Sequence, residues 1–214
     1  MIAVVDYGAG NLRSIVNAFA ALGREVALTS DAATLREATA IVLPGVGAFG
    51  AGMAQLRERD LVGPLNEAVR ERRVPFLGVC LGMQFMATRG EEHGHHDGLG
   101  WLDATVVEIV PPSPSYRVPH MGWNDVAIVR PSPLFAGLTA AAVFFFVHGY
   151  HLVPRHDDAP FVTATCSHGV PIVAAVQQDN MFGVQFHPEK SQADGLAVLR
   201  NFLDYVENGS ARAA

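Results

Sequence analysis

The sequence has few cysteines and no long apolar run. Only two of its 214 residues are cysteine, Cys80 and Cys166, which is too few for a disulfide framework. Thiols stay free in a reducing compartment, so we expect a cytoplasmic protein. No apolar stretch approaches the ~20 residues that a membrane-spanning helix needs. Residues 1–6 lack the basic segment of a signal peptide, so we expect neither a leader nor a membrane partner.

Charged residues are also scarce, at 17% of the chain, and the net charge is −6. Nucleic-acid-binding proteins usually concentrate basic residues on one face, so no nucleic-acid partner is expected. Half of the residues, 50%, are hydrophobic, and a chain of this length buries roughly 70% of its unfolded surface. We therefore expect a soluble globular domain over residues 1–208 and a short flexible tail over residues 209–214. The Pro/Ser-rich run 110–115 predicts a surface loop within the domain.

Strand-like and helical patterns alternate in the first half of the chain. Apolar runs predict strands over residues 2–7, 25–28, 41–43 and 76–79. Apolar residues on one face predict a helix over residues 12–22. This alternation predicts a parallel sheet that is covered by helices on both faces.

The second half is mostly strand-like. Its runs lie at residues 125–129, 143–150, 161–166, 172–178 and 181–186, and an amphipathic helix follows over residues 196–206. The Asp179-Asn180 pair predicts a hairpin between the last two strands. The predicted fold is α/β: a three-layer α/β/α domain with a mixed, mainly parallel sheet. Ligands of such sheets bind at the carboxyl ends of the parallel strands.

Cys80 follows an apolar strand pattern and has glycine two residues before it and two residues after it, Gly78 and Gly82. A reactive side chain on a sharp strand-to-helix turn needs small flanking residues, as in the G-x-S-x-G nucleophile elbow. A cysteine in an apolar stretch is more often a small buried hydrophobe. A second motif favours the reactive interpretation.

The second motif is His187-Pro188-Glu189. In an extended segment, residues two positions apart project to the same side, so the carboxylate of Glu189 can orient the His187 imidazole. Such a tripeptide alone also occurs in ordinary loops. Together with Cys80 it predicts a nucleophile, its base and the group that orients the base.

Acyl transfer also needs hydrogen-bond donors for the developing oxyanion. The Leu81 backbone N–H at the predicted turn is one candidate. A second donor can come from the glycine-rich run 44–50, because glycine allows a peptide to turn its N–H toward a site. Taken alone, this run is equally well explained as an ordinary loop.

Four other features have ordinary interpretations. The run 6–11 follows a strand, but Arg13 stands where the Rossmann fingerprint requires glycine, so we interpret it as a tight turn. The His-rich run 91–97 has no defined ligand spacing, so we expect a solvated loop and no metal. We expect Cys166 to be a buried strand residue and the run 144–146 to pack in the core.

The motif 78–84 and the triplet 187–189 together resemble those of the class I, triad-type glutamine amidotransferases. Within that family, the runs 6–14, 44–50, 119–124 and 146–150 resemble the glutaminase subunits that serve a (β/α)₈ cyclase in histidine biosynthesis. These segments span the chain from end to end. The run Pro119-His120-Met121-Gly122-Trp123-Asn124 points to this kind of subunit.

The resemblance implies roles for the site residues. Cys80 would form a γ-glutamyl thioester, His187 would act as base and then acid, and Glu189 would orient it. Val46 and Leu81 would supply the oxyanion amides. The glutamine substrate would be held by Gly47, Gln84 and the backbone around His148 and Gly149.

The resemblance also implies a heterodimer without a cofactor. The cyclase barrel would dock on Asn11, Met121, Trp123, Asn124 and Lys190, and ammonia would pass through it to a ribulosyl phosphate. Relatives usually have Ser or Thr at the position of Gly149, so any contact there must come from the backbone.

Two alternatives remain open at this point. The chain could be the glutaminase subunit of another synthase, such as anthranilate synthase, although the run 119–124 argues against it. It could also be an inactive docking subunit that retains the motifs. The complete set of triad residues argues against that second alternative.

Overall fold

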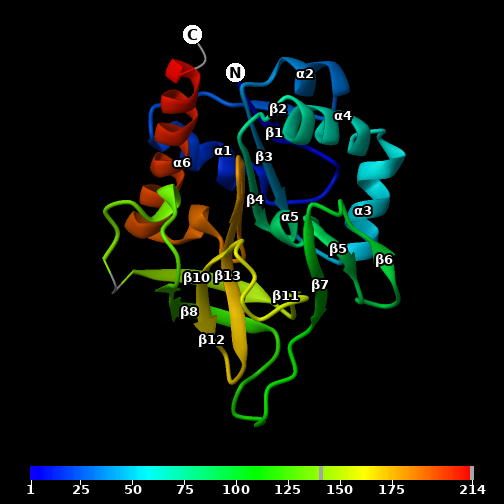
Figure 1. Ribbon diagram of the computed structural model, residues 1–214, viewed down its shortest axis with the longest axis vertical. Coiled ribbons are helices and arrows are strands. Elements are labelled where there is room, and N and C mark those ends of the chain that lie inside the picture. Colours follow the sequence, from blue (N-terminus) through cyan, green and yellow to red (C-terminus); the bar gives the residue numbers. More distant parts are fainter. Residues whose placement is uncertain (140–141, 213–214) are drawn as a thin grey trace.

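The computed structural model describes residues 1–139 and 142–212, without the side chains of residues 209–212. Its main sheet has eight strands in the order β2-β1-β3-β4-β14-β13-β12-β9 (Figure 1). The first five strands in this order run parallel to one another. The other three pair antiparallel at one edge. The predicted mixed, mainly parallel sheet is confirmed.

The strands of the main sheet are β1 Ile2–Val5, β2 Ala27–Thr29, β3 Ala40–Gly45, β4 Phe76–Cys80, β9 Ala127–Ile128, β12 Val162–Ser167, β13 Pro171–Gln178 and β14 Met181–Val184. The remaining strands are β5 Ala87–Gly90, β6 His96–Asp97, β7 Leu102–Glu108, β8 His120–Asp125, β10 Val143–His148 and β11 Tyr150–Pro154. The α-helices are α1 Leu12–Ala21, α2 Ala32–Glu37, α3 Phe49–Glu58, α4 Val62–Asn66, α5 Leu81–Gln84 and α6 Gln192–Arg212. A π-helical turn, Glu67–Glu71, continues α4, and 3₁₀ turns span Pro133–Phe135 and Pro188–Lys190.

Alternate residues of the central strands face two separate hydrophobic cores. On β3, Ile41 and Leu43 join the core that contains apolar residues of α2, α3 and α4. Val42 lies on the opposite face, in the core formed with α1 and α6. Side chains alternate along a strand, so a sheet with apolar residues on both faces requires a helical layer on each side. Figure 1 shows these layers, with α1 and α6 on one side and α2 to α4 on the other. The predicted α/β/α sandwich is confirmed.

The fold also contains two smaller sheets, whose strands pair antiparallel except for β5 and β7. Strand β10 pairs with β8, and β11 belongs to a four-stranded sheet in the order β11-β7-β5-β6. The single strand that we predicted over residues 143–150 is wrong, because the chain changes sheet at Gly149. The prediction over residues 125–129 was too long, since β9 spans only Ala127–Ile128. The predicted hairpin at Asp179-Asn180 is confirmed, with φ of 54° at Asp179 in the turn between β13 and β14.

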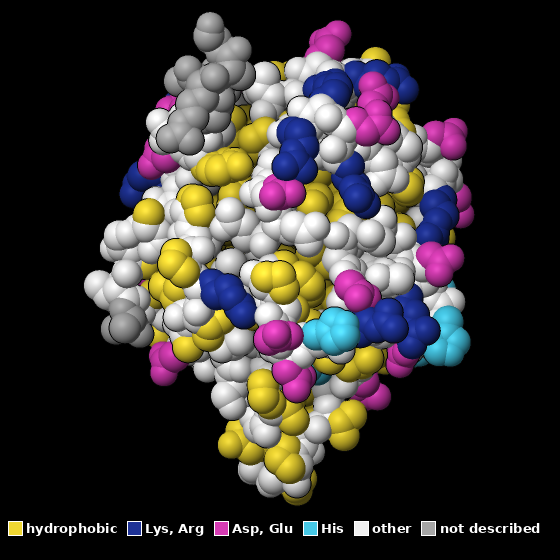
Figure 2. Space-filling model, viewed as in Figure 1, with side chains coloured by type: hydrophobic (Ala, Val, Ile, Leu, Met, Phe, Trp, Pro, Cys, Tyr) yellow, Lys and Arg dark blue, Asp and Glu magenta, His cyan; other side chains and the backbone are white. Residues whose placement is uncertain are grey.

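The segment between β7 and β8 forms a loop on the surface. Val110 is 73% exposed, and Tyr116 and Val118 are 42% and 40% exposed. This loop lies at the bottom of the view in Figure 2, where hydrophobic side chains gather on the surface. The surface loop predicted over residues 110–115 is confirmed.

The closing helix was predicted in the correct place but extends further than expected. It continues to Arg212, so the boundary that we placed after residue 208 falls inside it. Residues 213 and 214 lie outside the described residues, and the flexible tail stays a prediction. Among the described helices, none is long and apolar enough to cross a membrane.

Candidate active site

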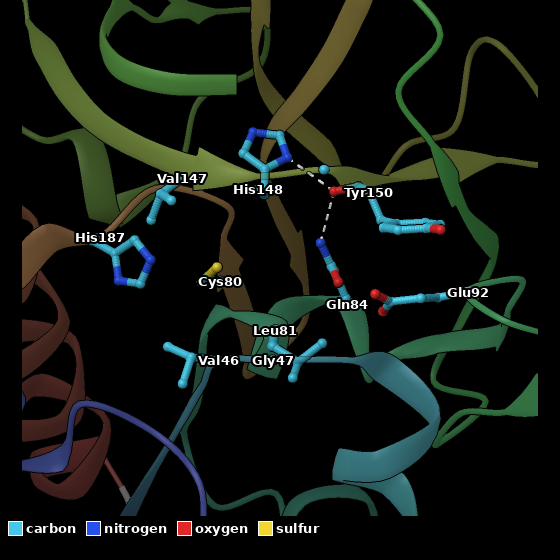
Figure 3. Close-up of a pocket in the computed structure, with 11 residues that line it drawn as sticks. Val46, Gly47, Cys80, Leu81, Gln84, Glu92, Val147, His148, Tyr150 and His187 are labelled. Carbon is cyan, nitrogen blue, oxygen red and sulfur yellow. Dashed lines mark hydrogen bonds between the residues drawn. The ribbon is translucent and has the colours of Figure 1, made fainter. Parts of the chain in front are cut away.

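Cys80 is the last residue of β4 and immediately precedes α5. Its φ of 55° and ψ of −108° are unusual for a residue with a side chain. Strain of this kind persists only where the surrounding structure enforces it, and it is concentrated at functional sites. The sharp turn predicted at Cys80 is therefore present. Figure 3 shows the thiol near the centre of a pocket.

The two glycines that flank Cys80 are required by close backbone approach. A Cβ on Gly78 would lie 2.6 Å from the carbonyl oxygen of Gly82. A Cβ on Gly82 would overlap the carbonyl oxygen of Leu43 on the neighbouring strand β3. Any side chain at Gly82 would therefore displace the turn that presents the nucleophile.

His187 and Glu189 form a buried pair, with 2.8 Å between His187 Nδ1 and Glu189 Oε1. Their side chains are only 3% and 2% exposed. We expected an extended segment, but residues 188–190 form a 3₁₀ turn that begins at Pro188. Proline fixes φ near −65° and favours the first position of a helical turn. The turn, not strand alternation, brings the carboxylate back to the imidazole.

Ser191 holds this turn against β10, although no sequence pattern indicated this role. Its hydroxyl donates to the His187 carbonyl at 2.6 Å and accepts the Phe145 backbone N–H at 2.9 Å. The His187 backbone N–H in turn donates to the Phe145 carbonyl at 2.9 Å. The backbone of His187 is therefore fixed from both sides.

The charge on His187 depends on its two neighbours. Burial lowers the pKa of the imidazole, but Cys80 and Glu189 favour the charged form more strongly and raise the pKa to about 9. His187 Nε2 is buried and has no hydrogen-bond partner among the described groups. Figure 3 shows the ring beside Cys80. A protonated His187 beside Cys80 and Glu189 is therefore favoured at neutral pH, and its proton is available for a leaving group.

This geometry predicts unequal effects of truncation at the two positions. His187→Ala should lower kcat for glutamine hydrolysis by at least about 10⁴-fold, because it removes the proton donor. Glu189→Ala should be about 100-fold less severe, because orienting a base contributes less than supplying one. Steady-state hydrolysis at saturating glutamine measures both values. Glu91→Ala removes a partly exposed carboxylate and serves as the control. Equal losses at His187 and Glu189 would mean that the carboxylate does more than orient the imidazole.

The pocket around Cys80 has a volume of about 310 Å³. It is lined by Val46, Gly47, Cys80, Leu81, Gln84, Glu92, Val147, His148, Gly149, Tyr150 and His187. Val46, Gly47 and Leu81 lie on the side opposite His148 (Figure 3). Leu81 is the first residue of α5, so its N–H has no partner within the helix. The structure thus brings Cys80, His187 and the predicted oxyanion and glutamine-binding residues together around one cavity. Glu189 does not line it and is linked to it through His187.

Gln84 is held in place by two hydrogen bonds. Its Nε2 donates to the Tyr150 carbonyl at 2.9 Å and to Gln185 Oε1 at 3.0 Å. Gln185 Nε2 lies 3.6 Å from the Cys80 sulfur. Both amide hydrogens of Gln84 are therefore used within the protein, which leaves its Oε1 as the group that can contact a ligand.

Glu92 lines the pocket, although we had placed it in a solvated loop. Its Oε2 accepts the Phe49 N–H at 2.7 Å, at the amino-terminal end of α3. A helix amino terminus attracts anions, and this hydrogen bond fixes the Glu92 carboxylate beside the pocket. No local sequence pattern indicates this contact, because 43 residues separate the two partners. Within residues 1–139 and 142–212, no group of three acidic, His or Cys side chains is arranged to hold a metal.

Tyr7 is a second buried residue whose position the sequence did not indicate. Its hydroxyl has no hydrogen-bond partner among the described groups and lies 2.5 Å from the point that a Cβ on Gly45 would occupy. Burial and the neighbouring Cys80 raise the pKa of this hydroxyl, while the nearby Val46 N–H lowers it less. Tyr7 therefore packs beneath the segment that carries the predicted oxyanion amide.

Cys166 and the run 144–146 can also be placed. Cys166 is 7% exposed on β12, and burial raises the pKa of its thiol to about 12, as expected for an unreactive strand residue. Phe144 and Phe146 are fully buried. Phe145 is only half-buried and faces the other way, toward Trp123, at 6.0 Å between ring centroids.

The residues predicted to meet a partner lie on several elements that pack near one another. Met121 and Trp123, on β8, are 65% and 48% exposed. Lys190 is the only lysine in the sequence, and its Nζ lies 6.0 Å from the Phe145 ring centroid. The turn that carries Lys190 packs against both α1 and β10. Asn11 is the N-cap residue of α1. Asn124 is half-buried and points its amide inward, to the Ser167 carbonyl.

The chain is similar to known proteins of one enzyme class. The model of the family described as "Glutamine amidotransferase class-I" matches residues 3–206. The PurLQS structure from Thermotoga maritima is similar, with a TM-score of 0.74 and 21% identity over 96% of this chain and 98% of that chain. The glutaminase domain of Trypanosoma brucei CTPS has a TM-score of 0.64 and 19% identity over 95% and 93% of the two chains. The chain belongs to the class-I glutamine amidotransferases, as the motifs predicted.

Several similar proteins carry the name of one particular subunit within this class. The chain is 44% identical to the imidazole glycerol phosphate synthase subunit HisH of Caulobacter vibrioides, over 95% of this chain and 98% of the relative. It is 48% identical to the subunit of the same name from Salinibacter ruber, over 94% and 93% of the two chains. The subunit from Zymomonas mobilis is 46% identical, over 95% of each.

Proposed function

We propose that this chain is the glutaminase subunit of an imidazole glycerol phosphate synthase. It hydrolyses glutamine to glutamate and ammonia with Cys80, His187 and Glu189. The ammonia passes to a (β/α)₈ cyclase subunit, which converts a phosphoribulosyl-formimino-AICAR phosphate to imidazole glycerol phosphate and AICAR in histidine biosynthesis. No cofactor takes part in the glutaminase reaction.

One observation carries this proposal. The chain aligns with relatives named as the HisH subunit over almost its whole length, at 44% to 48% identity. The buried His187–Glu189 pair beside Cys80 supports the same conclusion from the chemistry. The run 119–124 argues against the rival assignment, a glutaminase that serves anthranilate synthase. An inactive docking subunit would not need a cysteine beside this buried pair in a 310 Å³ pocket.

The first step forms a thioester. The Cys80 thiolate attacks the side-chain amide carbon of glutamine, and the negative charge develops on the carbonyl oxygen. The Leu81 and Val46 backbone N–H groups would stabilise that charge. His187 Nε2–H then protonates the leaving nitrogen, the C–N bond breaks and ammonia departs. The products of this step are a γ-glutamyl thioester on Cys80 and a neutral His187.

The second step releases glutamate. The neutral His187 takes a proton from water, the water oxygen attacks the thioester carbon, and the C–S bond breaks. The catalytic cycle thus ends where it began, with Cys80 as thiolate and His187 protonated. Glu92 projects into the pocket from the side opposite His187 (Figure 3), where it would bind the α-ammonium group of glutamine. Gln84 Oε1, Gly47 and the backbone at His148 and Gly149 would complete the binding site.

Gly149 leaves room for the hydroxyl-bearing side chain that the family resemblance implies at this position. A Cβ built there would have no heavy atom nearer than Val118 Cγ1, at 3.7 Å. The position therefore tolerates a side chain, and its backbone remains available to a ligand. Two buried free cysteines fit a reducing, cytoplasmic location for this chemistry.

The proposal is tested by glutaminase assays with and without the (β/α)₈ cyclase. The cyclase should form a heterodimer with this chain and raise kcat/KM for glutamine. Stimulation by an anthranilate synthase partner instead, or by neither, would show that the assignment is wrong.

Docking on the face that carries β8 predicts a strong effect of Trp123→Ala. Large aromatics at interface centres commonly contribute at least ~2 kcal/mol, so Kd for the cyclase should rise about 30-fold. The matched control is Leu28→Ala. Leu28 is 50% exposed on the edge strand β2, while β8 packs near the opposite edge, against β12. Titration of labelled cyclase measures both values. Equal affinities for the two variants would exclude Trp123 from the interface.

A further inference from the structure

A chain of hydrogen bonds leads from β8 into the glutamine pocket. Asn124 Nδ2 lies 3.2 Å from His120 Nε2. His120 Nδ1 lies 3.1 Å from His148 Nε2. His148 Nδ1 lies 2.9 Å from the Tyr150 carbonyl oxygen. His120 and His148 are directly opposite each other in the β8–β10 pairing, so the sheet register sets this contact.

The two ends of the chain fix the direction of every bond. The Tyr150 carbonyl can only accept, so His148 Nδ1 carries hydrogen. In a neutral ring Nε2 is then an acceptor, and His120 Nδ1 must donate to it. His120 Nε2 therefore accepts from Asn124 Nδ2. At the other end, Asn124 Nδ2 also donates to the Ser167 carbonyl, at 2.8 Å, and this bond independently identifies the nitrogen of the amide.

Both imidazoles are held in the neutral form. His120 and His148 are 3% and 6% exposed. Burial lowers the pKa of His120 to about 4, with a smaller contribution from His168, and burial lowers the pKa of His148 to about 3. The His120 ring is stacked between Phe146 and His168, with centroids at 4.8 Å and 4.3 Å. Its orientation is therefore fixed by packing as well as by hydrogen bonds.

The inner end of the chain reaches the nucleophile. The Tyr150 carbonyl that accepts from His148 also accepts from Gln84, at 2.9 Å (Figure 3). Gln84 donates in addition to Gln185, whose amide lies 3.6 Å from the Cys80 sulfur. The outer end lies on β8, next to the exposed Trp123. An uninterrupted series of polar contacts thus joins the strand proposed to meet the cyclase to the residues that line the catalytic pocket.

We propose that His120 is a positioning residue that couples the outer face of β8 to the glutamine pocket. This proposal rests on the proposed function, because it requires the cyclase to dock on β8. Both amide hydrogens of Asn124 are used internally, so a docked partner can add a hydrogen bond only at Oδ1. A donor there polarises the amide and strengthens the bonds along the chain, since successive hydrogen bonds reinforce one another. The Tyr150 carbonyl and Gln84 are then held more firmly for glutamine.

The direct test compares His120→Phe with His168→Phe in the presence of the cyclase. Both changes keep a ring in the stack, but only His120→Phe interrupts the chain. His120→Phe leaves His148 Nε2 buried without a donor, so stimulation of kcat/KM by the cyclase should fall about tenfold. The loss should appear mainly as a higher KM for glutamine. His168→Phe should stay within about twofold of the wild type.

The outcomes separate this proposal from the proposed function. If the cyclase does not bind or stimulate the wild-type chain, the proposed function is wrong. If it stimulates the wild type and His120→Phe equally, only the coupling through His120 is wrong. A measurement on the wild type avoids any folding defect of the variant. Nitrogen-15 spectra should show hydrogen on Nδ1 of both His120 and His148. Hydrogen on Nε2 of either ring would also overturn the proposal.

Discussion

A complex that carries Cys80→Ala should lose glutamine-dependent synthesis and still make product from ammonium salts. Cys80 is the only thiol at the pocket, because the other cysteine, Cys166, lies on β12 and does not line it. Without it no thioester forms, and glutamine hydrolysis should fall by at least about 10⁴-fold. The acceptor chemistry is placed on the cyclase, which needs only ammonia. Product formation with each nitrogen source measures the two reactions separately.

Cys166→Ala is the matched control for this experiment. It removes the same group from a site where burial raises the thiol pKa to about 12, so the residue stays protonated and unreactive. That variant should retain both reactions. A glutamine-like electrophile should likewise label Cys80 and spare Cys166. A Cys80→Ala complex that is inactive with both nitrogen sources would refute the division of labour between the subunits.

The sequence was sufficient for the parts of the site that depend on local geometry. Gly78 and Gly82 indicated a turn at Cys80, and the structure shows close backbone contacts at both glycines. The pattern can be recognised because its residues occupy five consecutive positions, although the contact that excludes a side chain at Gly82 comes from Leu43 on β3. The two helical layers were also predictable from local sequence, because a strand that is apolar on both faces must be covered on both faces.

Contacts between distant segments could not be predicted in this way. Glu92 reaches Phe49, and Gln84 reaches Gln185 across 101 residues. His120 meets His148 only because β8 pairs with β10 in one register. Neither segment alone specifies that register, because one strand could slide along the other without any change in the sequence pattern of either. The break at Gly149 was missed because the apolar run continues through it into a different sheet.

The relation of His187 to Glu189 shows a further limit. The two-residue spacing correctly paired the side chains, but the reason we gave for it was wrong. Strand alternation would require an extended backbone, whereas Pro188 begins a 3₁₀ turn. Two backbone geometries place residues two positions apart within reach of each other, so spacing alone does not distinguish them.

Gly82→Ala should destabilise the protein more than any other single methyl group added near the site. The new Cβ would overlap the Leu43 carbonyl, which belongs to the backbone of the central strand β3 and cannot rotate away. Overpacking usually costs 1–3 kcal/mol, and a clash with two fixed backbone segments should exceed that range. We expect the free energy of unfolding to fall by at least about 3 kcal/mol, with loss of glutaminase activity because the turn at Cys80 must shift.

Gly63→Ala adds the same methyl group where a built Cβ has no heavy atom within 4 Å. Gly63 lies in α4, and alanine is favoured over glycine inside helices by about 1 kcal/mol. This variant should therefore be unchanged or slightly more stable, with full activity. Denaturant unfolding of the two variants and the wild type, followed by far-ultraviolet circular dichroism, measures the difference. Should Gly82→Ala unfold within about 1 kcal/mol of Gly63→Ala and retain activity, close packing at Gly82 would not be what holds the nucleophile in place.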